Sequence, residues 1–255
     1  MKNNTLLSLE DVWENISQVE NKNKIKEFLH LVGVEFYDDE KEFIKDSSVK
    51  IVGIGGLKID HFVDKDGNLK LEKISDLILE MPTNSFKMSY LNSSNFSKEE
   101  IVNKIFEFKH YSVLHTITLN ILVSGVSTSV ENEFCCQRDI LHLSRITEAR
   151  TNIQTNPPIV VLSENLLLKI KDIIKDYKTK ISKIESDGDS KKDSLEAKNI
   201  LFPSAKATAF ILSGTIANFI KLCKFIEDDG KELEMKKVLR KINTILEDLL
   251  PQLKG

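Results

Sequence analysis

The sequence predicts an α+β fold in which helices predominate, and three stretches carry that prediction. Residues 116–124 alternate so that one side of the chain is fully apolar, which is typical of a strand that buries one face. Residues 166–186 repeat apolar side chains at the spacing of a long amphipathic helix. Residues 49–57 form a short apolar run that ends in glycines, as a strand followed by a turn does.

Composition is that of an ordinary globular protein. The 255 residues suffice for one large domain or two small ones, and 41% of them are hydrophobic and 29% charged. The net charge of −3 argues against broad electrostatic binding to nucleic acid. No apolar run approaches the roughly 18 residues of a membrane span, and the polar N-terminus is unlike a secretory signal. With only three cysteines, two of them adjacent, we expect reduced thiols and a cytoplasmic protein.

The N-terminal part is expected to begin with helices. Apolar residues recur at helical spacing within residues 9–45, which predicts two short amphipathic helices there. Residues 66–68, Asp-Gly-Asn, predict a hairpin turn. A short helix over residues 74–81 is expected to stop at Pro82, because proline has no backbone N–H to donate within a helix.

The middle of the chain carries clear helix-start signals. A helix is expected over residues 97–108, where the first residue, a serine, and Glu100 have the spacing of a capping box. The strand over residues 116–124 is expected to end at Gly125. Ser127 is then placed to cap a helix that runs to about Gln137.

The C-terminal part is expected to be mostly helical. After two prolines, residues 159–162 predict a short extended piece, followed by the long amphipathic helix already described. Residues 187–193 are polar and form the best linker in the chain. A long apolar helix is expected over residues 205–226 and a final amphipathic helix over residues 231–249. No strong internal domain boundary is visible.

Arginine is concentrated in one short stretch. The chain has four arginines, and three of them, Arg138, Arg145 and Arg150, fall within thirteen residues. A guanidinium group is always charged and binds phosphate or carboxylate bidentately, so the cluster predicts an anion-binding site. On a helix, Arg138, His142 and Arg145 would share one face. The helix expected from residue 205 would add backbone N–H donors and Lys206. A purely structural cluster of salt bridges is the alternative.

Residues 110–150 also gather three of the five histidines and two of the three cysteines. A metal site built from His110, His115, Cys135, Cys136 and His142 is one interpretation, but neither CxxC nor HExxH spacing is present, and we expect no metal. Packing of a cysteine on the inner face of a helix is the other interpretation. Cys136 would become a nucleophile only if one of the histidines lay beside it in the fold.

Short motifs follow one another from residue 110 to residue 138. They are His110-Tyr-Ser112-Val-Leu-His115-Thr, a strand, Gly125-Val-Ser127, a helix and Cys135-Cys-Gln-Arg138. This order resembles the flavin-dependent thymidylate synthases, which have H-x-S/T-x-x-E-H, a strand, G-x-S-R, a helix and R-H-R-x-x-S. The resemblance extends over about residues 49–251, because further positions fall in register: residues 49–52, 85–90 and 200–203, Ser213 and Glu234.

The resemblance implies a flavin-dependent thymidylate synthase-like fold, a mixed sheet flanked by long helices, over residues 49–255. Residues 1–48 would be an N-terminal helical extension. It also implies a homotetramer with FAD bound between subunits, and reductive methylation of dUMP or a related pyrimidine nucleotide with methylenetetrahydrofolate and NADPH. The implied cofactor-binding residues are His110, Ser112, His115, Gln137, Arg138 and Thr215. The implied substrate-binding residues are Glu133, Cys136 and Asn199, with Arg145 and Arg150 as arginines at new positions.

Several arginines of the family pattern are replaced in this chain. R-H-R reads Cys136-Gln137-Arg138, N-A-R reads Thr215-Ile216-Ala217, and Asn199 stands where an arginine precedes L-P. Loss of one buried charge-assisted contact costs roughly 2–5 kcal/mol, so loss of several should abolish ordinary dUMP binding. Three hypotheses follow: a flavoenzyme acting on a nucleotide-like substrate, a divergent homologue that binds flavin or nucleotide without thymidylate synthase activity, and a structural protein. No catalytic residue is assigned.

Overall fold

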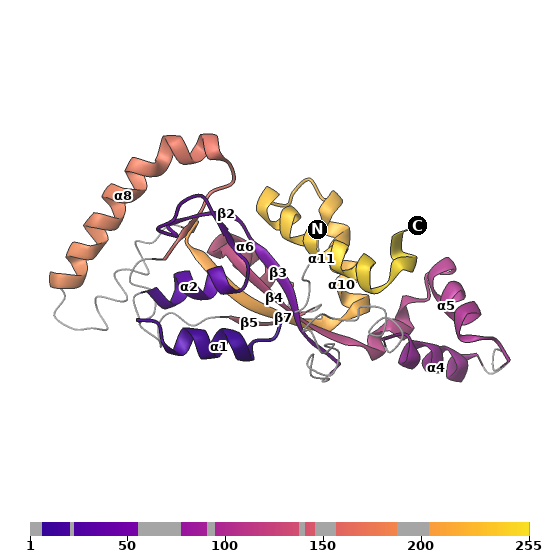
Figure 1. The fold of residues 1–255 in the computed structure, drawn as a ribbon. Helices are drawn as coiled ribbons and strands as arrows, with labels where there is room; N and C mark the ends of the chain where they lie inside the picture. Colours follow the sequence, from indigo (N-terminus) through magenta and orange to yellow (C-terminus); the bar gives the residue numbers. More distant parts are fainter. Residues whose placement is uncertain are drawn as a thin grey trace.

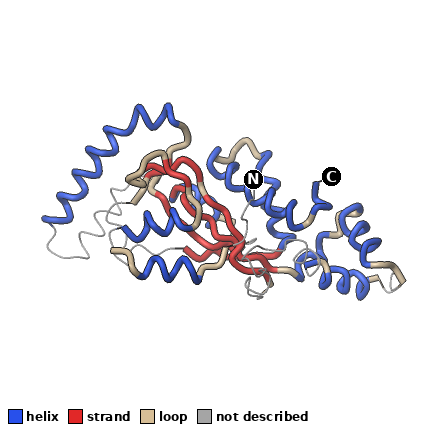
Figure 2. Tube along the Cα trace, viewed as in Figure 1, coloured by secondary structure: helices blue, strands red, loops and turns tan. Residues whose placement is uncertain are grey.

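The computed structural model describes residues 7–20, 23–55, 78–90, 95–137, 141–145, 157–187 and 204–254. They form an α+β fold in which a central sheet has helices on both faces (Figure 1). Figure 2 shows the strands gathered in the middle of the molecule and the helices around them. None of the helices in these ranges has the length and apolarity needed to cross a membrane.

The main sheet is antiparallel and has the order β3-β4-β7-β5. Its strands are β3 (Ser48–Ile54), β4 (Thr118–Ser127), β7 (Ala207–Thr215) and β5 (His142–Arg145). β4 and β7 pair along their full lengths and so form the centre of the sheet. Because side chains alternate along a strand, β4 and β7 contribute apolar residues to both faces.

A smaller, mixed sheet has the order β1-β2-β6. β1 (Glu35–Phe36) is antiparallel to β2 (Phe43–Asp46), which is parallel to β6 (Ile159–Val160). The long helix α8 (Glu164–Asp187) packs on this sheet through Leu167 and then extends away from the body of the molecule (Figure 1).

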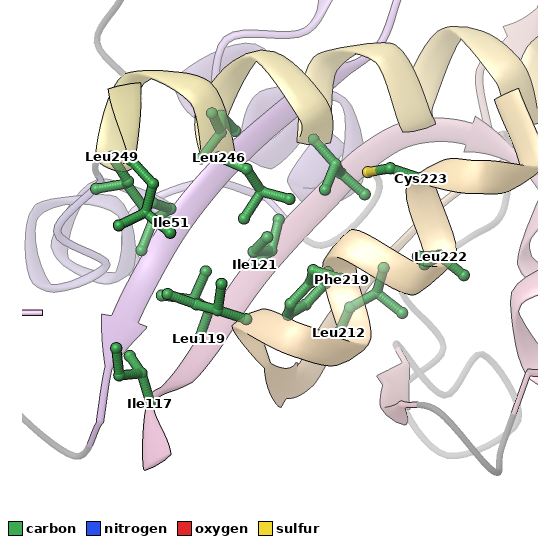
Figure 3. Packing of buried hydrophobic residues seen from close by; sticks show 14 of the residues in the cluster. Ile51, Ile117, Leu119, Ile121, Leu212, Phe219, Leu222, Cys223, Leu246 and Leu249 are labelled. Carbon is green, nitrogen blue, oxygen red and sulfur yellow. The ribbon is translucent and has the colours of Figure 1, made fainter. Parts of the chain in front are cut away.

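One face of the main sheet is covered by α6 (Thr128–Cys135), α10 (Ile216–Cys223) and α11 (Leu233–Leu249). Figure 3 shows the core of this face, in which side chains of α10 and α11 meet those of the strands. The labelled residues include Ile51, Leu119, Ile121, Leu212, Phe219 and Leu246. The 3-10 segment η5 (Lys224–Glu227) follows α10, and η6 (Pro251–Lys254) follows α11.

Three helical segments continue this core beyond the start of β4. They are α4 (Glu80–Ser89), α5 (Lys98–Glu107) and the 3-10 segment η4 (Tyr111–Thr116). Their buried side chains belong to the same hydrophobic cluster and include Phe86, Ile101 and Leu114. Figure 1 shows α4 and α5 at the end of the molecule opposite α8.

The opposite face of the main sheet is covered by α1 (Glu10–Ser17) and α2 (Lys24–Leu31). Val12, Phe28 and Leu29 of these helices pack against Leu122 of β4 and Ala209 of β7. Residues 7–20 and 23–46 are therefore part of the layered core, since they cover a face of the sheet and supply β1 and β2.

An ion pair joins the last helix to the smaller sheet. The Lys241 side chain of α11 places Nζ 2.7 Å from Asp46 Oδ2 and donates to the carbonyl oxygen of Ser47. The segment between β2 and β3 is thereby held against the C-terminal helix.

Local signals in the sequence located several elements correctly. The predicted capping box is present in α5, because Ser97 Oγ accepts from the Glu100 N–H and the Glu100 carboxylate accepts from the Ser97 N–H. Ser127 caps α6 as expected, with its Oγ accepting from the Val130 N–H at 3.3 Å. The structure also confirms the predicted strands, at residues 48–54 and 159–160, and the predicted helices α1, α2, α8 and α11.

The helix predicted over residues 205–226 is wrong. Residues 207–215 form β7, and only residues 216–223 are α-helical. An apolar run without clear polar alternation fits a buried helix and a buried strand equally well, and here pairing with β4 and β5 decides for the strand. The expected helix N-terminus with Lys206 in its first turn is accordingly absent, since Lys206 precedes β7.

The predicted end of a helix at Pro82 and the predicted end of a strand at Gly125 are also wrong. Helix α4 passes through Pro82, which lies in its first turn, where backbone N–H groups have no partner within the helix. β4 continues past Gly125 to Ser127, with a register shift that lets Gly125 adopt a φ of +73°. The hairpin turn at 66–68, residues 74–77 and the linker after Asp187 lie outside the described residues.

Candidate functional site

Two predicted cofactor-binding residues meet at the end of the main sheet where β4 begins and β7 ends. His115 Nδ1 lies 2.9 Å from Thr215 Oγ1, although 100 positions separate these residues. Thr215 is also the N-cap of α10, since its Oγ1 accepts from the Asn218 N–H at 3.3 Å. An exposed imidazole therefore lies beside the first turn of a helix, whose positive dipole end favours anionic or hydrogen-bond-accepting ligands.

A row of polar side chains crosses the sheet next to this pair. Asn120, Ser213 and His142 occupy directly paired positions on β4, β7 and β5, and paired positions in antiparallel strands share one face. Ser213 Oγ donates to Asn120 Oδ1 at 2.7 Å. On β3, Gly53 makes room for the amide, because a Cβ there would lie 2.9 Å from Asn120 Nδ2. We call Asn120, Ser213, His142 and Thr215 the polar row.

The sequence interpretation included Ser213 and His142 but missed Asn120. A polar residue between Leu119 and Ile121 in a strand that is otherwise apolar was the available signal. Thr215 lies two residues beyond Ser213 and so shares its face. The polar row therefore leads directly to His115.

A cavity of about 420 Å³ lies between the end of α6 and β5. Its lining residues are Cys135, Leu141, His142, Leu143 and Arg145. We call it the anion cavity, because His142 and Arg145 belong to the predicted anion-binding cluster.

Arg145 is held at this cavity by a buried carboxylate. Its Nη1 donates to Glu131 Oε1 at 3.4 Å, and the Glu131 side chain is 5% exposed whereas that of Arg145 is 59% exposed. A guanidinium has five N–H donors, and this contact uses one of them. The remaining donors give Arg145 the capacity to bind a phosphate or carboxylate bidentately.

The predicted helical face of Arg138, His142 and Arg145 is wrong. Residues 142–145 form β5, in which residues three apart project to opposite faces. His142 and Arg145 still line one cavity, because β5 is the last strand of the described sheet and both of its faces are accessible from that edge. Arg138, Arg150 and Asn199 lie outside the described residues.

The other predicted substrate-binding residues lie on or just after α6. Glu133 Oε2 is 3.7 Å from Lys231 Nζ, a residue that the sequence interpretation did not single out. Cys136 is exposed directly after the helix. Gln137 follows, and its carbonyl oxygen accepts from the Leu141 N–H at 3.0 Å.

His110 and Ser112 lie in different surroundings. The His110 ring is among three aromatic rings, with centroids 6.0 Å from Phe86, 5.7 Å from Tyr90 and 6.2 Å from Phe108. Ser112 is exposed on η4. This environment gives His110 an aromatic packing role, so the structure does not bring it together with the His115–Thr215 pair.

Cysteine and metal chemistry find little support in the described ranges. There, no group of three or more His, Cys, Asp or Glu side chains is gathered closely enough to hold a metal ion. Burial in the core raises the pKa of the Cys223 thiol to about 12, with a smaller effect from the charge of Glu247. Cys223 is therefore a packing residue.

A half-buried carboxylate ties α11 to the start of α6. Glu234 Oε1 accepts from the Ser127 N–H at 2.7 Å, across 107 positions of sequence. Burial raises the pKa of Glu234 above its ordinary value, and the hydrogen bonds from Ser127 offset part of that rise. Both residues are motif positions of the resemblance, and the bond fixes the two helices relative to each other.

Glu234 should make stability depend on pH. Its folded-state pKa is raised, so its contribution is fully present below the unfolded-state pKa and is lost as pH rises through the folded-state value. Urea unfolding measured from about pH 4 to pH 8 should therefore show a smaller decline in unfolding free energy for Glu234→Gln than for the native protein. The exposed Glu227→Gln is the matched control and should follow the native protein. Parallel curves for all three proteins would contradict the prediction.

Comparison with protein-family models finds no match, and comparison with curated proteins finds no similar sequence. The chemistry of the site is therefore inferred from its own hydrogen-bonding side chains. These are the imidazole and hydroxyl of the His115–Thr215 pair, the hydroxyl and amide of the polar row, and the guanidinium of Arg145. Such a set suits a ligand that is anionic and rich in hydrogen-bonding groups.

Proposed function

We propose that this chain is a flavin-dependent thymidylate synthase-like protein that binds FAD and a pyrimidine nucleotide. The observation that carries the proposal is the contact of His115 with Thr215 at 2.9 Å. The resemblance assigns both residues to the cofactor, from motifs far apart in sequence. The bond between Ser127 and Glu234, two further motif positions, adds support of the same kind.

The residues of the polar row fit a flavin cofactor by their chemistry. Hydroxyl, amide and imidazole groups match the carbonyl, ring nitrogen and ribityl groups of FAD, and the N-terminus of α10 favours its phosphates. His115, Thr215, Ser213 and Asn120 would hold the cofactor. Bound FAD supplies the hydride and methylene transfer chemistry, while these residues bind and orient it.

The nucleotide is assigned to the anion cavity. Arg145 and His142 would bind its phosphate there, and the volume of about 420 Å³ falls in the ordinary range of small-molecule sites. The reaction would be reductive methylation of dUMP or a related pyrimidine nucleotide, with methylenetetrahydrofolate and NADPH as co-substrates. A cytoplasmic homotetramer, in which FAD lies between subunits, belongs to the same proposal.

A second candidate function is binding of flavin or nucleotide without thymidylate synthase activity. Two ion pairs favour it, because Glu131 engages Arg145 and Lys231 engages Glu133. Each pair neutralises a charge that the first function would direct at the substrate. Cys136, in place of an arginine of the family pattern, removes a further cation from this region.

Flavin binding is the direct test. We expect the purified protein to show flavin absorbance, either as isolated or after addition of FAD and removal of excess. Thr215→Ala should weaken FAD binding about tenfold, because it removes the hydroxyl that joins His115 to the helix cap. Thr215→Ser keeps that hydroxyl and should bind FAD like the native protein.

Two outcomes separate the candidate functions. If folded protein with saturating FAD shows no bound flavin, the first is overturned, and if dUMP also fails to bind, both are. If flavin binds, complementation of a thymidine auxotroph supports the first function, and failure to complement by well-expressed protein supports the second.

A further inference from the structure

A second cavity lies between the N-terminal helices and the main sheet. It has a volume of about 330 Å³ and lies on the face opposite α10 and α11. Leu9 and Ile16 form one wall, and Leu122 and Ile211 of the strands form the other. We call it the α1–α2 cavity. The size and the apolar walls are those of a site for a small organic ligand.

A flat aromatic surface lines the α1–α2 cavity. The rings of Trp13 and Phe28 are stacked, with centroids 5.7 Å apart and an interplanar angle of 11°. Phe28 is buried at 7% exposure, whereas Trp13 is 52% exposed. The indole is therefore supported from beneath while much of it remains accessible, which suits stacking with another planar ring.

The charges that line the α1–α2 cavity are positive. Lys24 and Arg145 are among its lining residues, and none of the described residues that line it carries a carboxylate. Arg145 is engaged by Glu131. Lys24 begins α2, is partly buried, and is therefore the cation best placed for a ligand in this cavity.

We propose that the α1–α2 cavity binds a small planar aromatic anion, with the ring against Trp13 and the anionic group at Lys24. The apolar walls exclude water from the ring, and the positive rim selects a carboxylate over a neutral group of the same shape. This site shares Arg145 with the anion cavity but contains none of the residues proposed to hold FAD. It gives a binding role to residues 9–28, which the family resemblance does not cover.

Trp13 provides a built-in reporter for the test, because it is the single tryptophan of the chain. Naphthalene-2-carboxylate is the probe, and naphthalene-2-carboxamide is its neutral counterpart. Titration of the full-length protein with the carboxylate should change the Trp13 emission saturably. Calorimetry should give the same dissociation constant, and the carboxamide should bind about fivefold more weakly.

Variants separate the charge from the ring. Lys24→Gln should weaken carboxylate binding about fivefold and leave carboxamide binding unchanged. The exposed Lys221→Gln on α10 is the matched control and should change neither. Trp13→Leu keeps an apolar contact with Phe28 and should weaken both probes by a similar factor in calorimetry.

The proposal is overturned if neither probe binds saturably at millimolar concentration. It is also overturned if carboxylate and carboxamide bind equally to native protein and to Lys24→Gln. A Trp13 emission that changes on simple dilution of the protein, without any probe, would show that a second copy covers the cavity and would likewise exclude it.

Discussion

Replacing Gly125 with alanine is expected to destabilise the protein by about 3 kcal/mol. Gly125 has a φ of +73°, and an added Cβ would lie 2.7 Å from Val34 Cγ1 and 2.8 Å from Val34 Cγ2. Val34 is itself buried, so its side chain has little room to move away. Backbone strain and steric overlap therefore act together at the point where the N-terminal segment crosses β4. Urea unfolding measures the effect directly.

Gly55→Ala is the matched control for backbone strain alone. Gly55 has a φ of +52°, and an added Cβ would have no atom of the described residues within 4 Å. We expect it to cost about 1 kcal/mol. In a Val34→Ala background the further cost of Gly125→Ala should fall to a similar value, because the overlapping methyl groups are gone. Equal costs for Gly125→Ala and Gly55→Ala in the native background would contradict this account.

Replacing Arg145 with alanine is expected to lower the free energy of unfolding by about 2 kcal/mol. The change removes the cation that faces the Glu131 carboxylate, which stays buried. The loss is smaller than for a fully buried pair, because the Arg145 side chain is largely exposed. The same variant should weaken binding of a nucleotide monophosphate at the anion cavity by at least about tenfold.

Two further variants distinguish the two roles of Arg145. Adding Glu131→Gln to Arg145→Ala should restore most of the stability, because the buried carboxylate is no longer charged, but should not restore nucleotide binding. Arg240→Ala, at an exposed position of α11, should leave both properties unchanged. Recovery of nucleotide binding in the double variant would show that Arg145 acts only through stability.

The features that were predictable from the sequence depend on interactions between near neighbours. The Ser97 capping box and the Ser127 cap each join residues three apart, and the spacing alone identifies them. Helix α8 was equally clear, because its apolar residues keep one periodicity over its whole length. Such signals need no knowledge of the rest of the fold.

The features that could not be predicted depend on long-range pairing. Residues 207–215 contain both small and bulky apolar side chains, and only the neighbouring strands β4 and β5 make them a strand. The conformation at Gly125 depends on the bulge that its pairing with β7 creates. Pro82 was misplaced for a different reason. Proline is tolerated in the first turn of a helix, and the sequence did not show that α4 begins at Glu80.

The candidate site divides in the same way. Residue types and motif order are enough to indicate His115, Thr215 and Arg145 as candidate binding residues. Their partners are less accessible to such reasoning: Lys231 lies about a hundred positions from Glu133, and the contact of Asn120 with Ser213 requires the register of two strands. Charge pairing across that distance leaves no periodic trace in a single sequence.

The ion pair between Lys241 and Asp46 has a consequence for how the protein is made. Lys241 also contacts Ser47, 194 positions earlier in the chain. At a synthesis rate of roughly 5–20 residues per second, roughly 10–40 s pass between the synthesis of Ser47 and that of Lys241. Helix α11 also supplies much of the core on its face of the sheet. We therefore expect this face of the sheet to stay uncovered during synthesis until residue 249, the end of α11, has been added.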